Sequence, residues 1–185
     1  MATYTVHTAP TVHTVRTVRT VRTVHASPLG DLRLTGSVSP AGDLSLTSLS
    51  LPGRRDAPEA RTEDRDDRPF AEAHRQLDAY FAGRRTRFGL PLSPAGSPFQ
   101  HAVWQALDDV PYGTTTTYGE LAVRLGVPRS EIRSVGRALG ANPLLLLRPC
   151  HRVIGADGSL RGYAGGIENK RWLLTHEGAL QPTLL

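Results

Sequence analysis

Residues 142–155 have the sequence NPLLLLRPCHRVIG, which contains the only cysteine of the chain, Cys150. Its run of four leucines predicts a buried strand or turn, and Pro149 fixes the backbone immediately before the cysteine. A lone cysteine is most often a small buried hydrophobic residue. However, His151 and Arg152 follow directly, and ionisable neighbours of this kind favour the reactive thiolate. The neighbours therefore favour a reactive cysteine over a purely structural one.

His151 is a candidate base for this nucleophile. Adjacent side chains of an extended backbone point in opposite directions, so His151 reaches Cys150 only across a sharp turn or through a water. An acid that orients the histidine, for which Glu177 is the candidate, would complete the set of nucleophile, base and orienting group used in covalent catalysis. Taken alone, His151 would be interpreted as a core histidine with satisfied hydrogen bonds.

Upstream of this segment, two short helices predict a helix-turn-helix motif. The first is expected over 117–126, and the second over 131–140 with Ser130 as its N-cap. A short turn that contains glycine separates them, as is typical of the motif. Arg133 and Arg137 lie four residues apart and therefore share one face of the second helix.

Positive charge is concentrated in the same part of the chain. The sequence has 22 Lys+Arg and 17 Asp+Glu, which gives a formal net charge of +5. Residues 124–161 contain seven arginines and two acids, so this window alone accounts for the net charge of the whole chain. A phosphate backbone selects such a surface, although a solvated arginine-rich face would have the same composition.

The N-terminal half has a different pattern and is separated from this region by a segment rich in proline and glycine, residues 90–98. Alternating runs at 31–35 and 43–49, joined by a Pro/Gly turn, predict an antiparallel hairpin. Residues 54–68 alternate charges of both signs and predict an exposed, mobile loop. A helix is expected over 69–82 because its apolar residues recur at helical spacing.

The first residues contain three consecutive copies of Thr-Val-Arg, at 14–22. A period of three matches neither a helix nor a strand, so residues 1–19 are expected to form a disordered, low-complexity arm. The arm is either a dispensable tail or a nonspecific DNA contact made through its arginines. The sequence as a whole predicts an α+β protein, with an N-terminal α/β domain at 20–92 and a mainly helical domain at 96–180.

Composition excludes several kinds of protein. A single cysteine cannot form a disulfide within the chain or a cysteine-rich zinc site. No apolar run approaches the ~20 residues of a membrane span, and the N-terminus lacks the apolar core of a secretory signal. We therefore expect a soluble, cytoplasmic protein without membrane contact.

Residues 149–153, PCHRV, resemble the active-site signature of the O6-alkylguanine-DNA alkyltransferases, also called methylated-DNA–protein-cysteine methyltransferases. The resemblance covers nearly all of residues 96–178, and residues 27–30 fit the weaker N-terminal pattern of the family. The further matching segments are 96–104, 111–113, 117–121, 133–136, 140–143, 162–166 and 170–177.

The resemblance implies direct-reversal DNA repair. The alkyl group of O6-alkylguanine, and also of O4-alkylthymine, would be transferred once to Cys150, with irreversible self-inactivation. The partner would be double-stranded DNA, bound through its minor groove by a monomer that flips the damaged base out of the stack. The family implies no cofactor and, because this chain lacks N-terminal cysteines, no metal site. It also implies a ribonuclease-H-like fold for the N-terminal domain and a helix-turn-helix in the domain with the active-site cysteine.

The resemblance also implies a role for individual residues. Glu177 would orient His151, which would deprotonate Cys150 through a water. Tyr118 would donate a proton to the leaving guanine, and Asn142 would join the DNA-reading helix to the cysteine segment. The residues expected to line the substrate pocket are Tyr163, Ala164 and Gly165. The residues expected to contact DNA are Arg133, which would fill the gap left by the flipped base, Ser134, Arg137, Tyr118 and Arg152.

Arg148 and Arg161 depart from the family pattern, because apolar or small residues are expected there. Both are expected near the cysteine, where they would contact DNA or narrow the pocket. For Arg133, the simpler alternative is a phosphate contact. Three other kinds of protein compete with repair: a lesion-binding relative without chemistry, a helix-turn-helix regulator and a cysteine hydrolase. Cys150 argues against the first, and the regulator would not need the PCHRV segment.

Overall fold

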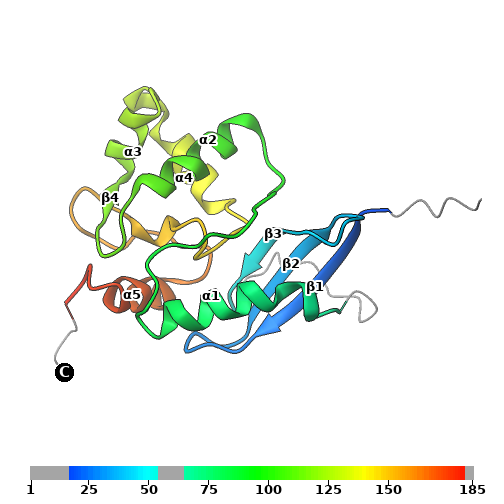
Figure 1. Ribbon diagram of the computed structural model, residues 1–185. Helices are drawn as coiled ribbons and strands as arrows, with labels where there is room; N and C mark the ends of the chain where they lie inside the picture. Colours follow the sequence, from blue (N-terminus) through cyan, green and yellow to red (C-terminus); the bar gives the residue numbers. More distant parts are fainter. Residues whose placement is uncertain (1–16, 54–64, 182–185) are drawn as a thin grey trace, which may run out of the picture.

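A computed structural model describes residues 17–53 and 65–181, and it shows a three-stranded sheet with one helix followed by a mainly helical part (Figure 1). This order confirms the α+β prediction. The strands are β1 (Arg19–His25), β2 (Leu32–Val38), β3 (Leu44–Ser50), β4 (Thr116–Thr117) and β5 (Val153–Ile154). The α-helices are α1 (Ala71–Phe81), α2 (Pro98–Ala106), α3 (Tyr118–Arg124), α4 (Ile132–Gly140) and α5 (Ile167–His176).

The N-terminal sheet is antiparallel and has the order β1-β2-β3. Buried residues alternate with more exposed ones along β2, because successive residues of a strand face opposite sides of the sheet. The predicted hairpin of β2 and β3 is confirmed, with Val38 paired to Leu44 beside the turn. Strand β1 already includes Arg19, the last residue assigned to the arm, while residues 1–16 lie outside the described part.

Helix α1 lies along the sheet (Figure 1). It begins at Ala71, two residues later than expected, because Arg68–Phe70 form a 3₁₀ turn that includes the proline. Its Leu77 is fully buried in the core, and the Nδ1 atoms of His74 and His25 lie 2.9 Å apart at the contact with β1. Most of the charged loop expected before α1 lies outside the described residues.

In the C-terminal part, α2, α3 and α4 pack against one another. The indole Nε1 of Trp104 in α2 donates a hydrogen bond to the carbonyl oxygen of Ala138 in α4, at 2.8 Å. Helices α2 and α3 both begin with a capping box, in which the N-cap side chain and the residue three positions later satisfy each other's backbone N–H. Helix α3 therefore starts within one residue of its predicted position.

The start of α4 is different, and the prediction that Ser130 is its N-cap is wrong. Ser130 lies inside a 3₁₀ turn, Arg129–Glu131, and α4 itself begins at Ile132 without a side-chain cap. The 3₁₀ turn takes up the residues that were expected to form the first helical turn. The motif of two short helices, α3 and α4, is nevertheless present.

The two parts of the chain share one continuous cluster of buried hydrophobic residues. Strand β3 also joins them through its backbone. The N–H of Leu49 donates to the carbonyl of Pro143 at 2.8 Å, and the N–H of Leu145 donates to the carbonyl of Leu49 at 3.1 Å. The N-terminal sheet therefore holds the turn that leads to Cys150.

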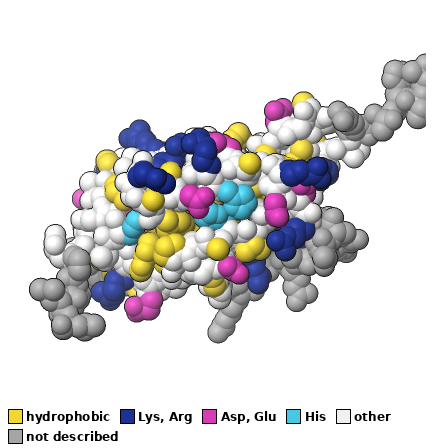
Figure 2. Space-filling model, turned by 60° about the horizontal axis from the view of Figure 1, so that its bottom comes forward, with side chains coloured by type: hydrophobic (Ala, Val, Ile, Leu, Met, Phe, Trp, Pro, Cys, Tyr) yellow, Lys and Arg dark blue, Asp and Glu magenta, His cyan; other side chains and the backbone are white. Residues whose placement is uncertain are grey.

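Helices α1 and α5 meet through aromatic rings. Trp172 stacks on His176 with ring centroids 4.9 Å apart, and Phe81 of α1 lies 6.0 Å from Trp172. Figure 2 shows hydrophobic and histidine side chains next to one another on the face that is at the bottom of Figure 1. This contact brings the end of α1 close to the end of α5, where Glu177 follows.

Candidate active site at Cys150

Cys150 follows a tight turn of buried leucines and has 6% of its surface exposed. Within this turn Leu146 has φ = 70°, a left-handed conformation that costs a residue with a Cβ about 1–2 kcal/mol. Residues Cys150–Arg152 then form a 3₁₀ turn. Successive side chains of a 3₁₀ turn point about 120° apart, so Cys150 and His151 do not face in opposite directions as they would in a strand. The structure thus has the sharp turn that a contact between them requires.

Asn142 connects the end of α4 to this turn. Its Nδ2 donates to the carbonyl of Arg148 at 2.9 Å and to the sulfur of Cys150 at 3.2 Å. Its Oδ1 accepts a hydrogen bond from the N–H of Leu144 at 3.0 Å, and the residue is fully buried. A donor directed at sulfur stabilises the thiolate more than the thiol, so Asn142 both shapes the turn and favours the reactive form of Cys150.

The carboxylate of Glu177, which follows α5, is the centre of a buried network. Its Oε1 accepts from Tyr80 Oη at 2.8 Å and lies 2.9 Å from both His151 Nε2 and Arg152 Nη2, while its Oε2 lies 2.7 Å from Arg152 Nε. Burial alone would raise the pKa of Glu177, but the hydrogen bonds and charges of His151 and Arg152 lower it to about 2. Glu177 is therefore an anion at neutral pH.

This anion determines which nitrogen of His151 carries a proton. Because ionised Glu177 can only accept, His151 Nε2 must donate to it, and Nδ1 is the basic nitrogen of the neutral ring. His151 is fully buried, and burial lowers its pKa although Glu177 acts in the opposite direction. Nδ1 has no hydrogen-bond partner among the described residues. A neutral, oriented imidazole next to a cysteine is suited to accept the thiol proton.

Lys170 is a second buried charge near the cysteine. Its Nζ donates to the carbonyl oxygens of Val153 and Arg161, both at 2.6 Å, and its side chain is fully buried in α5. Burial lowers the pKa of Lys170 to about 8, and the neighbouring Cys150 acts against that shift. The ammonium thus ties the segment after Cys150 to α5 and adds positive charge close to the sulfur.

Cys150 opens onto a cavity of about 310 Å³. Its walls come from the start of α3, from α4 and from the loop after β5. The lining residues are Tyr118, Gly136, Leu139, Gly140, Cys150, Gly162, Tyr163 and Ala164. Burial and then the neighbouring Cys150 raise the pKa of Tyr118, so its phenol stays protonated at neutral pH. The cavity therefore brings together a cysteine and a phenol that can donate a proton.

Two of the three expected pocket residues, Tyr163 and Ala164, line this cavity. The third, Gly165, is buried behind them and does not line it. A Cβ on Gly165 would lie 2.7 Å from the ring of Tyr163 and 3.2 Å from Leu51, so a larger residue would push the tyrosine. Gly165 shapes the pocket by letting Tyr163 pack closely.

Comparison with known proteins places the chain in a family. Residues 98–179 match the 6-O-methylguanine DNA methyltransferase DNA binding domain, and residues 20–94 match the ribonuclease-like domain of the same enzyme. A methylated-DNA–protein-cysteine methyltransferase of Mycolicibacterium paratuberculosis is 44% identical over 159 residues, which are 86% of this chain and 93% of the relative. The chain belongs to the methylated-DNA–protein-cysteine methyltransferases.

Solved structures of this family have the same fold. The O6-methylguanine methyltransferase of Mycobacterium tuberculosis aligns with a TM-score of 0.76 and 43% identity, covering 89% of this chain and 96% of the relative. The OGT protein of Mycobacterium tuberculosis, solved in complex with DNA, aligns with a TM-score of 0.75 and 43% identity, covering 88% of this chain and 94% of the relative.

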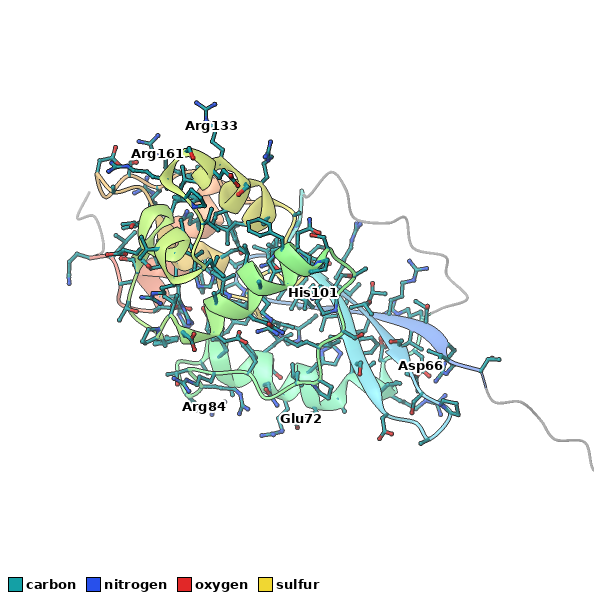
Figure 3. All side chains as sticks on the ribbon, turned by 90° about the horizontal axis from the view of Figure 1, so that it is seen from above. Asp66, Glu72, Arg84, His101, Arg133 and Arg161 are labelled. Atoms are coloured by element: carbon teal, nitrogen blue, oxygen red, sulfur yellow. The ribbon has the colours of Figure 1, made fainter. Side chains whose placement is uncertain are left out.

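The arginines of α4 lie apart from the cysteine network. Arg133 and Arg137 are exposed, and Figure 3 shows Arg133 projecting outward from the protein with Arg161 at the same edge. Neither Arg133 nor Arg137 forms an ion pair among the described residues. Ser134 is half-buried and donates to the carbonyl of Glu131 at 2.7 Å, so it already stabilises the first turn of α4. In this member of the methyltransferase family, α4 therefore offers an exposed cationic face.

The structure corrects the expectation that Arg152 contacts DNA. The side chain is 8% exposed and makes an ion pair with Glu177 at 2.7 Å. Its Nη1 donates to the carbonyl of Val110 at 2.7 Å, and its guanidinium lies 5.8 Å from the centre of the Tyr112 ring. All three guanidinium nitrogens are occupied inside the protein. Arg152 is thus a partner of the buried Glu177 carboxylate.

The two arginines that depart from the family pattern are also placed by the structure. Arg148 is mostly buried, forms an ion pair with Asp108 and lines a separate cavity rather than that of Cys150. Arg161 is exposed, binds Asp157 at 2.9 Å and Ser159 Oγ at 3.0 Å, and does not line the Cys150 cavity. Neither side chain narrows the pocket.

Sequence reasoning missed Tyr80 and Lys170 as parts of the site. Helical spacing places Tyr80 only on the apolar face of its helix, and its bond to Glu177 joins residues 97 positions apart. The sequence does mark Lys170 in one way, since it is the only lysine in an arginine-rich chain.

Within residues 17–53 and 65–181, no three His, Cys, Asp or Glu side chains are grouped so as to hold a metal ion. Over the same residues, no helix has the length and apolar character needed to cross a membrane.

Proposed function

We propose that this protein is a methylated-DNA–protein-cysteine methyltransferase. It repairs O6-alkylguanine, and also O4-alkylthymine, by a single transfer of the alkyl group to its own Cys150. The observation that carries the proposal is the cysteine itself, which opens onto a cavity while an oriented histidine and a buried carboxylate lie beside it. A regulator would need none of these groups.

The reaction is a displacement at the alkyl carbon. The thiol proton of Cys150 passes through a water to His151 Nδ1, and the resulting sulfur anion attacks the carbon attached to O6. The new S–C bond forms as the C–O6 bond breaks, and the electron pair of the broken bond goes to the guanine. Glu177 stabilises the imidazolium that is formed. The product is a stable thioether, so each molecule acts once and needs no cofactor.

Tyr118 supplies the proton that the leaving guanine requires. Its phenol lines the same cavity as Cys150, and its raised pKa keeps the proton available until negative charge develops on the base. Guanine then departs as a neutral molecule rather than as an anion. His151 returns the proton to the phenol through solvent, so the protein as a whole gains one CH₂.

DNA is the macromolecular partner in this proposal. A base inside a duplex hides its O6 group, so the nucleotide must be flipped into the cavity. Helix α4 enters the minor groove, Arg133 fills the gap in the stack, and Arg137 contacts the backbone. A groove with a degenerate base code suits a protein that must act at any sequence. Support comes from the exposed arginines of α4 and from the match to the DNA binding domain.

The division of labour between the two parts is also proposed. Residues 96–180 form the domain that binds DNA and performs the chemistry. Residues 20–92 form a second domain, which packs against the first and holds the turn before Cys150 in place. One molecule contains the complete site, so the protein acts as a monomer. The backbone bonds from β3 to the turn before Cys150 support this division.

Mass spectrometry of the intact protein tests the proposal. After incubation with a duplex that contains O6-methylguanine, we expect the protein to gain one CH₂, and an undamaged duplex of the same sequence should give no gain. Cys150→Ser should remove the gain while lesion binding persists. Lesion binding without any gain by the unaltered protein would contradict alkyl transfer, and release of methanol with repeated turnover would indicate a hydrolase.

A further inference from the structure

We propose that Tyr80, contributed by α1 of the N-terminal part, is a positioning residue for the His151–Glu177 pair. Its hydroxyl shares Glu177 Oε1 with His151 and thereby sets how strongly the carboxylate holds the imidazole. This inference rests on the proposed function of Cys150 and assigns part of the reaction machinery to the N-terminal part of the chain.

The geometry of the shared oxygen is the first support. Tyr80 Oη, His151 Nε2 and Arg152 Nη2 lie 2.8, 2.9 and 2.9 Å from Glu177 Oε1. The side chains of His151 and Glu177 are both fully buried, and Tyr80 is 0% exposed. No bulk water competes for this oxygen, so each donor directly affects the strength of the others.

The way in which Tyr80 is held is the second support. Its ring contacts those of Phe88, Tyr112 and His176, with centroids 5.3, 6.1 and 5.2 Å away. His176 Nε2 also lies 2.9 Å from the carbonyl oxygen of Tyr80. Consecutive residues, His176 and Glu177, are therefore both bound to Tyr80, one through its backbone and one through its side chain. Such a fixed phenol can hold a carboxylate in one orientation.

The charged groups around His151 determine whether Tyr80 favours the neutral or the protonated imidazole. Glu177 faces the ring from the end of α5, Lys170 from within α5 and Arg152 from the turn that contains His151. The ring of Tyr163, from the loop after β5, lies 6.3 Å from that of His151 and is uncharged while its phenol is protonated. Of these groups, only the carboxylate stabilises the protonated imidazole in the resting protein. A donor that takes up part of the charge of Oε1 weakens this stabilisation. Tyr80 therefore helps to keep His151 neutral and able to accept the thiol proton.

Tyr80 itself remains a donor throughout. Burial and the adjacent Glu177 raise its pKa far above that of a free tyrosine, so the phenol does not ionise while the protein is folded. The contrasting interpretation is that Tyr80 is only a large core aromatic. Tyr80→Phe separates the two, because it keeps the ring and removes only the hydroxyl.

Tyr112→Phe is the matched control. Tyr112 belongs to the same ring cluster and lies close to Arg152, but its hydroxyl is bonded to the carbonyl of His176 at 3.3 Å rather than to Glu177. Both variants lose one phenol oxygen from the same region. Only Tyr80→Phe removes a donor from the carboxylate.

The experiment has two readouts on the full-length protein. In the first, ¹⁵N-histidine NMR follows the titration of His151, whose signal is assigned by its absence from His151→Gln. In the second, single-turnover transfer from an O6-methylguanine duplex is measured from about pH 5 to 9, across the usual range of histidine titration. The NMR readout does not depend on repair, so it tests the role of Tyr80 even if the unaltered protein transfers no methyl group.

For Tyr80→Phe we expect the titration of His151 to move upward by about half to one pH unit. The acid limb of the rate profile should move with it, so that transfer slows about 3- to 10-fold on that limb while the high-pH plateau stays within about twofold. Tyr112→Phe should leave both readouts unchanged. An unchanged His151 titration in Tyr80→Phe, or the same shift in both variants, would overturn the proposal.

Discussion

The network around Glu177 and the arginine face of α4 differ in how their charged groups are surrounded: the first is buried and hydrogen-bonded, and the second is exposed. Three side chains donate four hydrogen bonds to the fully buried carboxylate of Glu177. Arg133 and Arg137 are exposed and have no ion pair among the described residues. A dry, fixed network sets protonation states, whereas mobile surface charges suit phosphates that arrive in many positions. The molecule thus separates the charges proposed to control the reaction from those proposed to bind DNA.

Glu177→Gln should disrupt the buried network and have the largest effect on stability and on methyl transfer. The neutral amide leaves the Arg152 guanidinium buried without a counter-charge, which should cost about 3–5 kcal/mol of unfolding free energy. His151 loses its ionised acceptor, so methyl transfer should slow by about 100-fold or more. Urea unfolding and single-turnover transfer measure the two effects.

Glu168→Gln is the control for this variant, because it removes the same charge from an exposed position in the first turn of α5. It should change the unfolding free energy by less than about 0.5 kcal/mol. Similar losses in the two variants would mean that the buried network has no special role in stability.

Acid should reduce the contribution of the same network to the unfolding free energy by a few kcal/mol. The pKa of Glu177 is about 2 in the folded protein and near its ordinary value of 4.5 when the chain is unfolded. A lowered folded pKa adds stability that is complete above the unfolded pKa and is lost as pH falls from about 4.5 toward 2. In urea unfolding, the stability difference between the unaltered protein and Glu177→Gln should therefore narrow over this range. A difference independent of pH would contradict the assignment.

Arg133→Ala tests the exposed side of the comparison. Loss of the residue proposed to fill the base stack should slow the repair of duplex DNA by about tenfold or more, because base flipping costs a few kcal/mol. Repair of free O6-methylguanine base should change little. Arg84→Ala removes an exposed arginine at the opposite edge of the protein (Figure 3) and is the control. Equal losses on duplex and free base would contradict the role.

Arg137→Ala should give the smallest effect. A single exposed phosphate contact contributes about one unit to the dependence of log affinity on log salt. The variant should bind duplex DNA a few-fold more weakly and with a slope lower by about 1. Fluorescence anisotropy at several salt concentrations measures this slope. An unchanged slope would place Arg137 outside the interface.

The sequence predicted the elements whose signals are local. The hairpin of β2 and β3 follows from alternation, and α3 starts within one residue of its predicted position. Ser130 failed as a cap because a 3₁₀ turn and an α-helical first turn have similar sequence signals. The sequence also predicted a reactive cysteine, because His151 and Arg152 follow Cys150 directly in the chain.

The rest of the site depends on contacts between distant residues. Arg152 is next to His151 in sequence, but only the folded chain shows that its side chain turns inward to Glu177. Tyr80 has the spacing of a core residue, and its hydroxyl finds its partner in another part of the protein. Helical spacing predicts which face is buried but not which polar atom meets which.

Strand β3 is an edge strand of its sheet, yet other segments of the chain pair with its free edge. Leu46 pairs with Leu92 of the segment that links the two parts, and Leu49 pairs with Leu144 beside the active-site turn. Open edge strands invite pairing with other molecules and are common starting points of aggregation. On this edge, a second chain would have to displace the linking segment and the turn before Cys150. The same backbone contacts that position the nucleophile thus protect the sheet from aggregation.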